Sequence, residues 1–243
     1  MAKTLFASVL LLFVSAPVFA LVDTAWVRRY DGPQNDIDAA TALAVDGSGN
    51  VYVTGYHTGL ASLHDYATIK YEPDGTCAWV KKYNGPGGGW DAAAAIAVDA
   101  SGNVFVTGAS SDSMGIMDYA TLKYDSLGYW RFLRRYDGPG NGSDVAQAMA
   151  MDDSGCVYVT GYSQGDGTDY DYATIKYLPS GVVAWVARYN GPGNGVDWAN
   201  DVAVDPSGFV YVTGTSAGVG TGMDYATVKY YPSGDTAWIR RYN

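Results

Sequence analysis

Two stretches of this sequence gather side chains that bind metal ions. One holds His57 and His64, and the other holds Asp166, Asp169 and Asp171. Two imidazoles beside a carboxylate can hold Zn²⁺, and an oxygen-rich loop with glycine suits Ca²⁺. The histidine spacing matches no known ligand pattern, so exposed loop histidines are the plainer interpretation. The sequence predicts no cofactor, and Ca²⁺ at the acidic loop is the alternative.

Catalytic chemistry has little support among the other side chains. Asp201 stands where the other copies of its segment carry Ala42, Ala95 and Ala148. A single carboxylate without a partner makes no acid–base pair. The sequence also lacks a phosphate-binding loop, so no catalytic residue is predicted.

These residues belong to a chain that repeats itself. The interval is constant between Tyr30, Tyr83, Tyr136, Tyr189 and Tyr242. That period of 53 residues contains no insertion or deletion, and periods of this size are typical of arrays whose units bury their apolar faces by stacking. We predict repeats at residues 31–83, 84–136, 137–189 and 190–242, within one domain that spans 21–243.

Charged residues that recur in every copy indicate a structural role. Each copy contains an Asp-Tyr-Ala-Thr-x-Lys-Tyr segment, with the lysine at Lys70, Lys123, Lys176 and Lys229. A buried charge without a partner is costly. We therefore expect each lysine to pair with a recurring aspartate between units.

Each copy reads as four antiparallel strands. An alanine-rich strand such as 38–45 alternates with period two and ends at a turn with glycine. Val51-Tyr-Val-Thr-Gly55, the 65–71 segment and a segment with Trp79 follow. Four-stranded units with a longer link between them are typical of a β-propeller, with the small residues innermost. The predicted fold is all-β, with four full blades and one orphan N-terminal strand, 23–30.

The motif Val-Asp-x-Ser-Gly-Asn-Val-Tyr-Val-Thr-Gly, followed by Asp-Tyr-Ala-Thr-x-Lys-Tyr and Trp-x-x-x-Tyr, resembles the bacterial SBBP repeat, which is named for seven-bladed propellers. The resemblance covers residues 22–243. It implies an exported or surface propeller and supplies no catalytic residues.

The sequence does not decide whether the blades close into a ring. Residues 23–30 and 236–242 are both fourth strands, so the ends do not complement each other. A four-bladed ring with a spare strand, an open arc that pairs with another chain, and a segment of a longer product all remain. The open arc predicts self-association, in which a second copy completes the ring.

Residues 1–20 resemble a secretory signal. Lys3 precedes an apolar run from Leu5 to Val14, and small residues precede the expected cleavage after Ala20. The predicted location is therefore periplasmic, cell-surface or extracellular, without a membrane span. Cys77 and Cys156 occupy different repeat positions, which predicts two free thiols.

The charge pattern limits the partners. The net charge is −10, and the fifteen basic residues all have places in the signal or the repeats, apart from Arg131. Nucleic acid is therefore not an expected partner. The main functional hypothesis is a noncatalytic exported scaffold or a module that binds a protein or glycan. The alternative is a propeller hydrolase or lyase that acts on extracellular polysaccharide.

Overall fold

The computed structural model describes residues 24–60 and 62–243, so the signal segment predicted at 1–20 lies outside the described residues. These residues form sixteen strands and contain no helix. The strands make four separate sheets, each antiparallel and in sequence order. No helix in the described part of the chain is long and apolar enough to cross a membrane.

Each sheet is one blade. Blade 1 consists of β1 (Asp38–Val45), β2 (Val51–His57), β3 (Asp65–Tyr71) and β4 (Cys77–Tyr83). Blade 2 consists of β5 (Asp91–Val98), β6 (Val104–Ser111), β7 (Met117–Tyr124) and β8 (Trp130–Tyr136). Blade 3 consists of β9 (Asp144–Met151), β10 (Val157–Gln164), β11 (Tyr170–Tyr177) and β12 (Val183–Tyr189). Blade 4 consists of β13 (Asp197–Val204), β14 (Val210–Gly218), β15 (Gly222–Tyr230) and β16 (Thr236–Tyr242).

Local chemistry explains the hairpins. In the turn between β1 and β2, the Asp46 carboxylate accepts hydrogen bonds from the amides of Ser48 and Asn50 and from the Tyr52 hydroxyl. Partial burial opposes ionisation, yet these bonds lower the pKa of Asp46 overall. Gly49 has φ of 82°, which glycine adopts at little cost. The same turn recurs in every blade.

The glycine of each Val-Thr-Gly segment is needed for close packing of strands. A Cβ built on Gly161 would lie 2.0 Å from the carbonyl oxygen of Val145 on the neighbouring strand. A register shift in the β9–β10 ladder occurs at this position. A bulge here therefore brings the first strand of the blade unusually close to the second.

Stacked blades form the core. Three apolar clusters each join one face of a blade to the opposite face of the next. A recurring tyrosine fixes each junction, because its hydroxyl donates to a backbone carbonyl of the next blade. The three bonds are Tyr66 to Ala120 (3.3 Å), Tyr119 to Ala173 (3.1 Å) and Tyr172 to Ala226 (3.2 Å).

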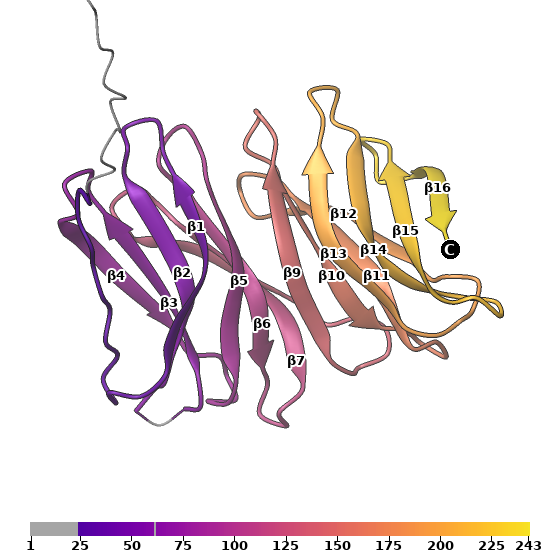
Figure 1. The fold of residues 1–243 in the computed structure, drawn as a ribbon, viewed down its shortest axis with the longest axis horizontal. Helices are drawn as coiled ribbons and strands as arrows, with labels where there is room; N and C mark the ends of the chain where they lie inside the picture. The colour runs from indigo at the N-terminus through magenta and orange to yellow at the C-terminus, as the bar shows by residue number, and fades with distance from the viewer. Residues whose placement is uncertain (1–23, 61) are drawn as a thin grey trace, which may run out of the picture.

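The four blades lie in an open row. Figure 1 shows blade 1 at one end and blade 4 at the other. The first strands of adjacent blades, β1, β5, β9 and β13, lie against one another, which confirms the predicted innermost position of the alanine-rich strands. The closed four-bladed ring considered from the sequence is therefore not the arrangement in this structure.

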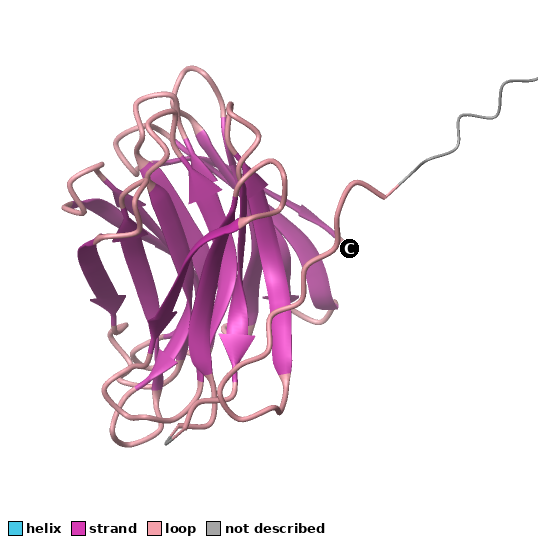
Figure 2. Cartoon of the chain, turned by 90° about the vertical axis from the view of Figure 1, so that its left-hand side faces the viewer, coloured by secondary structure: helices cyan, strands magenta, loops and turns pink. Residues whose placement is uncertain are grey.

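Residues 24–30 do not form the strand that the sequence predicts. They run as an extended loop across the exposed face of blade 1 (Figure 2). Trp26 Nε1 donates to the carbonyl of Pro73, and Arg28 Nε donates to the carbonyl of Gly75. No neighbouring strand pairs with this segment in the described residues, so it makes side-chain contacts without a ladder.

Candidate functional site

One arginine of the last strand makes the same set of side-chain contacts in blades 2, 3 and 4. We name this arginine and its partners the clasp. In blade 3, the Arg188 guanidinium donates to the hydroxyls of Tyr136 and Ser163, to the carbonyl of Ser163 and to the Asp171 carboxylate. Arg135 and Arg241 make the same contacts in blades 2 and 4. The tyrosine comes from the preceding blade, so each clasp also joins two blades.

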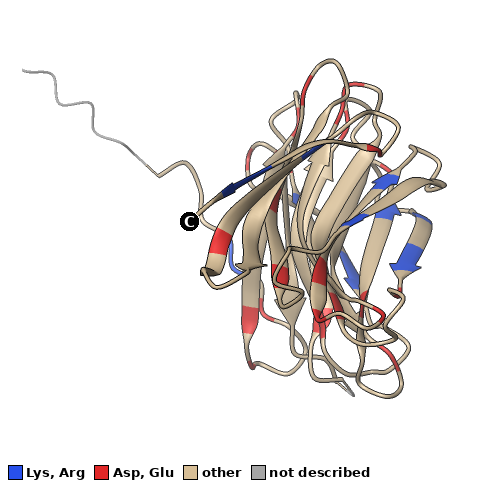
Figure 3. Cartoon of the chain, turned by 90° about the vertical axis from the view of Figure 1, so that its right-hand side faces the viewer, with Lys and Arg blue, Asp and Glu red and all other residues tan. Residues whose placement is uncertain are grey.

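The predicted pairs between lysine and aspartate are wrong. Among the described residues, Asp118, Asp171 and Asp224 pair with arginines of the last strand. The lysine ammonium groups instead lie over aromatic rings, as Lys123 does at 4.6 Å from the ring centre of Phe105. An aromatic face attracts a cation while leaving part of it hydrated. In Figure 3, Lys and Arg lie mainly on strands, apart from Arg28 and Arg29 in the extended segment 24–30, whereas Asp and Glu also occupy turns.

The expectation that the chain has no Gly-x-Ser-x-Gly motif is wrong, because two such segments occur, at 161–165 and 214–218. Their serines, Ser163 and Ser216, are fully buried within β10 and β14 and accept hydrogen bonds from the clasp arginines. A serine nucleophile of this motif needs an exposed turn between a strand and a helix. These serines are therefore structural.

Blade 1 carries a different clasp. His57 stands where the other blades have serine, and Lys82 stands where they have arginine. The His57 side chain is buried, with Nδ1 3.0 Å from the carbonyl of Thr58 and Nε2 3.9 Å from Asp65. His64 instead lies between the rings of Tyr56 and Trp90, with centroids 4.6 and 4.2 Å away.

The two histidines predicted as metal ligands therefore lie apart, because His57 packs near Asp65 and His64 packs between Tyr56 and Trp90.

The aspartates of the acidic loop in blade 3 also differ in their surroundings. Asp166 and Asp169 are exposed, whereas Asp171 is buried against Arg188. Neither set forms a close group of three ligand atoms in the described part of the chain. The predicted Ca²⁺ and histidine–metal sites stay predictions, and Asp201 lies exposed on β13.

The described residues hold one close group of three carboxylates, which we name the carboxylate trio: Asp118, Asp137 and Asp144. One oxygen from each lies within 4.8 Å of the others. Asp118 is the second residue of β7 in blade 2, and Asp144 is the first residue of β9 in blade 3. Asp137 lies in the link between these blades. Sequence reasoning missed the trio, because the position of Asp137 alternates between aspartate and asparagine, with Asp31, Asn84 and Asn190 in the other copies.

The environments of the trio differ. Asp144 is buried, and its oxygens accept the amides of Gly138 and Gln164 at 2.6 and 3.1 Å. Burial, with smaller contributions from Asp137 and Asp118, raises the pKa of Asp144 to about 6. Burial also raises the pKa of Asp118, although bonds from Arg135 oppose the change. Asp137 is exposed and can touch a ligand.

A hollow of about 380 Å³ lies between blades 2 and 3 and is lined by residues of β5 and β9. Its lining includes Trp90 and Tyr162, whose rings flank the small alanines of β5 and β9. Met117 and Val145 also line it, whereas the adjacent Asp118 and Asp144 do not, because successive side chains of a strand point to opposite faces. We name this cavity the inner hollow. Its aromatic faces are suited to a ring-shaped ligand.

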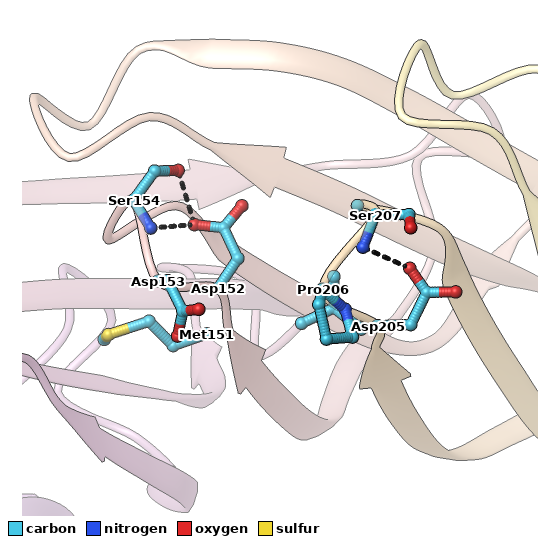
Figure 4. A pocket seen from close by; sticks show the side chains of 9 residues that line it. Met151, Asp152, Asp153, Ser154, Asp205, Pro206 and Ser207 are labelled. Atoms are coloured by element: carbon cyan, nitrogen blue, oxygen red, sulfur yellow. Dashed lines mark hydrogen bonds between the residues drawn. The ribbon is translucent and has the colours of Figure 1, made fainter.

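A second hollow, of about 370 Å³, lies between the turns of blades 3 and 4 (Figure 4). Three carboxylates line it, those of Asp152, Asp153 and Asp205. Asp152 and Asp205 each accept the amide of a serine in their own turn, Ser154 or Ser207. Two of the three groups thus already serve the hairpins, so the carboxylate trio is the stronger candidate.

Both cysteines are free, with Cys77 exposed and Cys156 buried, which confirms the prediction of two thiols.

Comparison with known families identifies the SBBP beta-propeller repeat at residues 25–59 and 184–219. No curated protein matches the sequence.

Several solved structures are similar to this chain. A gluconolactonase from Xanthomonas campestris is 13% identical with a TM-score of 0.47, and the match covers 84% of this chain and 62% of that one. A GH43_1 enzyme from Xanthomonas citri, complexed with xylotriose, is 11% identical with a TM-score of 0.47 over 84% and 72%. An alpha-L-arabinofuranosidase from Fusarium graminearum is 9% identical with a TM-score of 0.49 over 82% and 65%. This chain thus spans less than two thirds of the first and third of these.

These neighbours contradict the main functional hypothesis from the sequence. A noncatalytic scaffold or binding module was expected, whereas the neighbours are enzymes and agree better with the alternative of a propeller hydrolase or lyase. At such low identity the likeness concerns the fold, and no activity is carried over from them. The family match confirms the repeat type but not seven blades. The chain carries SBBP beta-propeller repeats, arranged as four blades in this structure.

Proposed function

We propose that this protein is a hydrolase or lyase that acts on a polysaccharide at the carboxylate trio. The observation that carries the proposal is the clustering of Asp118, Asp137 and Asp144. Two of the strands that supply the trio, β7 and β9, also contribute Met117 and Val145 to the inner hollow, which Trp90 and Tyr162 line as well. The aromatic rings supply stacking faces for sugar rings. The trio supplies carboxyl groups for proton transfer at the bond between two sugars.

The close spacing of the trio bears on this chemistry. Cleavage with retention of configuration uses two carboxyl groups about 5–5.5 Å apart, and wider pairs invert. The trio, within 4.8 Å, is near the closer arrangement. Asp144 is too deeply buried to touch substrate. Its raised pKa of about 6 keeps it protonated in mildly acidic solution, and its charge influences its neighbours.

Asp137 is then the residue that contacts substrate. It is exposed, and it is held close to two carboxyls that resist ionisation. Burial raises the pKa of Asp118 and of Asp144, so these two carboxyls retain a proton more readily than isolated carboxylates do. A retained proton is what a leaving sugar oxygen requires.

A panel of soluble polysaccharides tests the proposal. New reducing ends indicate hydrolysis, and ultraviolet absorbance of an unsaturated product distinguishes a lyase. On any substrate that is turned over, Asp137→Asn is expected to lower kcat by about a hundredfold or more. Asp166→Asn is the matched control, because it removes one exposed carboxylate of blade 3 away from the trio.

Two results would overturn the proposal. One is the absence of turnover across the panel by folded protein. The other is an Asp137→Asn variant as active as Asp166→Asn. Equal thermal unfolding of the two variants excludes loss of fold as the cause.

A further inference from the structure

The two end blades expose the two halves of an interface that occurs three times within the chain. The forward half centres on a tyrosine of the third strand. Tyr66, Tyr119 and Tyr172 are 2%, 0% and 0% exposed, because each inserts against the next blade. The equivalent Tyr225 in blade 4 is 68% exposed. Tyr242 of β16 is likewise exposed, whereas its equivalents Tyr83 and Tyr189 are buried.

The receiving half is exposed on blade 1. Ala93, Ala146 and Ala199 are almost completely buried by the preceding blade, but the equivalent Ala40 is exposed. Leu43 and Val45 are also exposed, while their equivalents in blades 2 to 4 pack against the apolar clusters.

A hollow of about 370 Å³ lies in front of this receiving face. Ala40, Val53, Ala67, Ile69 and Tyr71 are among its lining residues. At the internal junctions, the matching positions are filled by the tyrosines of the preceding blade. The carbonyl of Ala67 corresponds to the acceptors Ala120, Ala173 and Ala226 that those tyrosines bind. The hollow thus has the shape and the acceptor for a tyrosine.

The segment 24–30 covers only the edge of this face, as a substitute for one strand. Its bond from Trp26 to the carbonyl of Pro73 repeats the bonds from Trp79 to Ser126 and from Trp185 to Pro232. Its sequence, Thr-Ala-Trp-Val-Arg-Arg-Tyr, differs from that of β16 only by valine in place of isoleucine. It therefore makes the contacts of a preceding blade's last strand without the rest of that blade.

We infer that two copies of this chain join head to tail, with blade 4 of each stacked on blade 1 of the other to close a ring of eight blades. In each junction β16 takes the place of segment 24–30, and the Tyr225 hydroxyl donates to the carbonyl of Ala67 in the second copy. The occupant is a second copy because its blade 4 carries the side chains that fill this interface three times inside the chain. Two equivalent junctions leave no face uncovered, and eight blades lie within the usual range for propellers.

Light scattering after size exclusion tests the inference on the full chain. The expected mass is that of two chains. Tyr225→Asp and Ala40→Arg are each expected to give single chains, because both replace an exposed residue of one half-interface with a charge that would be buried there. Tyr129→Asp is the control, because Tyr129 is exposed in a turn of blade 2. It should leave two chains together.

Mixing the two variants provides a stricter test. Tyr225→Asp keeps an intact receiving face, and Ala40→Arg keeps an intact forward face. A mixture can therefore form one junction, and a two-chain species should reappear in the mixture although neither variant forms it alone. A wild-type protein that stays a single chain, or a mixture without this species, would overturn the inference.

The displacement of segment 24–30 is tested separately. A Trp26→Ala, Arg28→Ala double variant loses the bonds that hold the segment on blade 1. If β16 of a second copy must displace the segment, the variant should associate about tenfold more tightly. Weaker association would mean that the segment belongs to the interface and would overturn the displacement.

Discussion

Replacement of Arg188 by methionine should strongly destabilise the fold. Arg188 neutralises Asp171, which is 5% exposed, and bonds two hydroxyls and one carbonyl. Removal leaves a buried carboxylate without a cation, which costs about 3–5 kcal/mol for a buried pair. Because part of the guanidinium is accessible to water, we expect the lower end, about 3 kcal/mol.

Urea unfolding measures this loss as a shift of the midpoint with an unchanged slope. Arg131→Met is the matched control. Arg131 also pairs with a carboxylate, that of Asp125, but its side chain is 58% exposed, so the expected loss is below about 1 kcal/mol. Adding Asp171→Asn to the Arg188 variant removes the unpaired charge and should restore part of the stability. Equal losses for the two arginine variants, or no restoration, would refute the argument from buried charge.

Two further predictions concern the trio and the bulge. Because burial raises the pKa of Asp144 from 3.8 to about 6, the folded state binds more protons than the unfolded state between these values, and stability should fall as pH rises through that window. Asp144→Asn should flatten this part of the pH dependence of unfolding, and a slope equal to that of the wild type would count against it. Gly161→Ala should cost about 2–3 kcal/mol in urea unfolding because its Cβ meets the Val145 carbonyl. Gly47→Ala, which meets no atom within 4 Å, should be nearly neutral, and similar losses for both would contradict the packing argument.

The sequence was sufficient to predict what depends on local pattern. The strand 38–45, the glycine turn after it and the Val-Thr-Gly strand all form, because alternation and turn chemistry act within a few residues. Segment 24–30 did not form a strand, although its sequence nearly equals that of β16. A strand requires a neighbour to pair with, and β16 has one in β15 whereas segment 24–30 has none among the described residues.

The candidate site depends on contacts between repeats of the same chain, and these contacts were harder to predict. Asp118 and Asp144 belong to different repeats and meet only because one blade stacks on the next. The same difficulty explains the wrong pairing of the lysines. Periodicity places Lys123 and Asp118 on one strand, but the cross-strand register brings Arg135 to the carboxylate and leaves the lysine over a ring.

Each junction between blades uses the same tyrosine, the same backbone acceptor and the same clasp. A unit inserted or removed as a whole would therefore meet neighbours that already fit it. Genetic duplication or loss of one 53-residue unit would change the curvature and span of the array without requiring any compensating substitution. Evolution of such a protein can then proceed by changing the number of units, while single positions such as Asp137 differ between units.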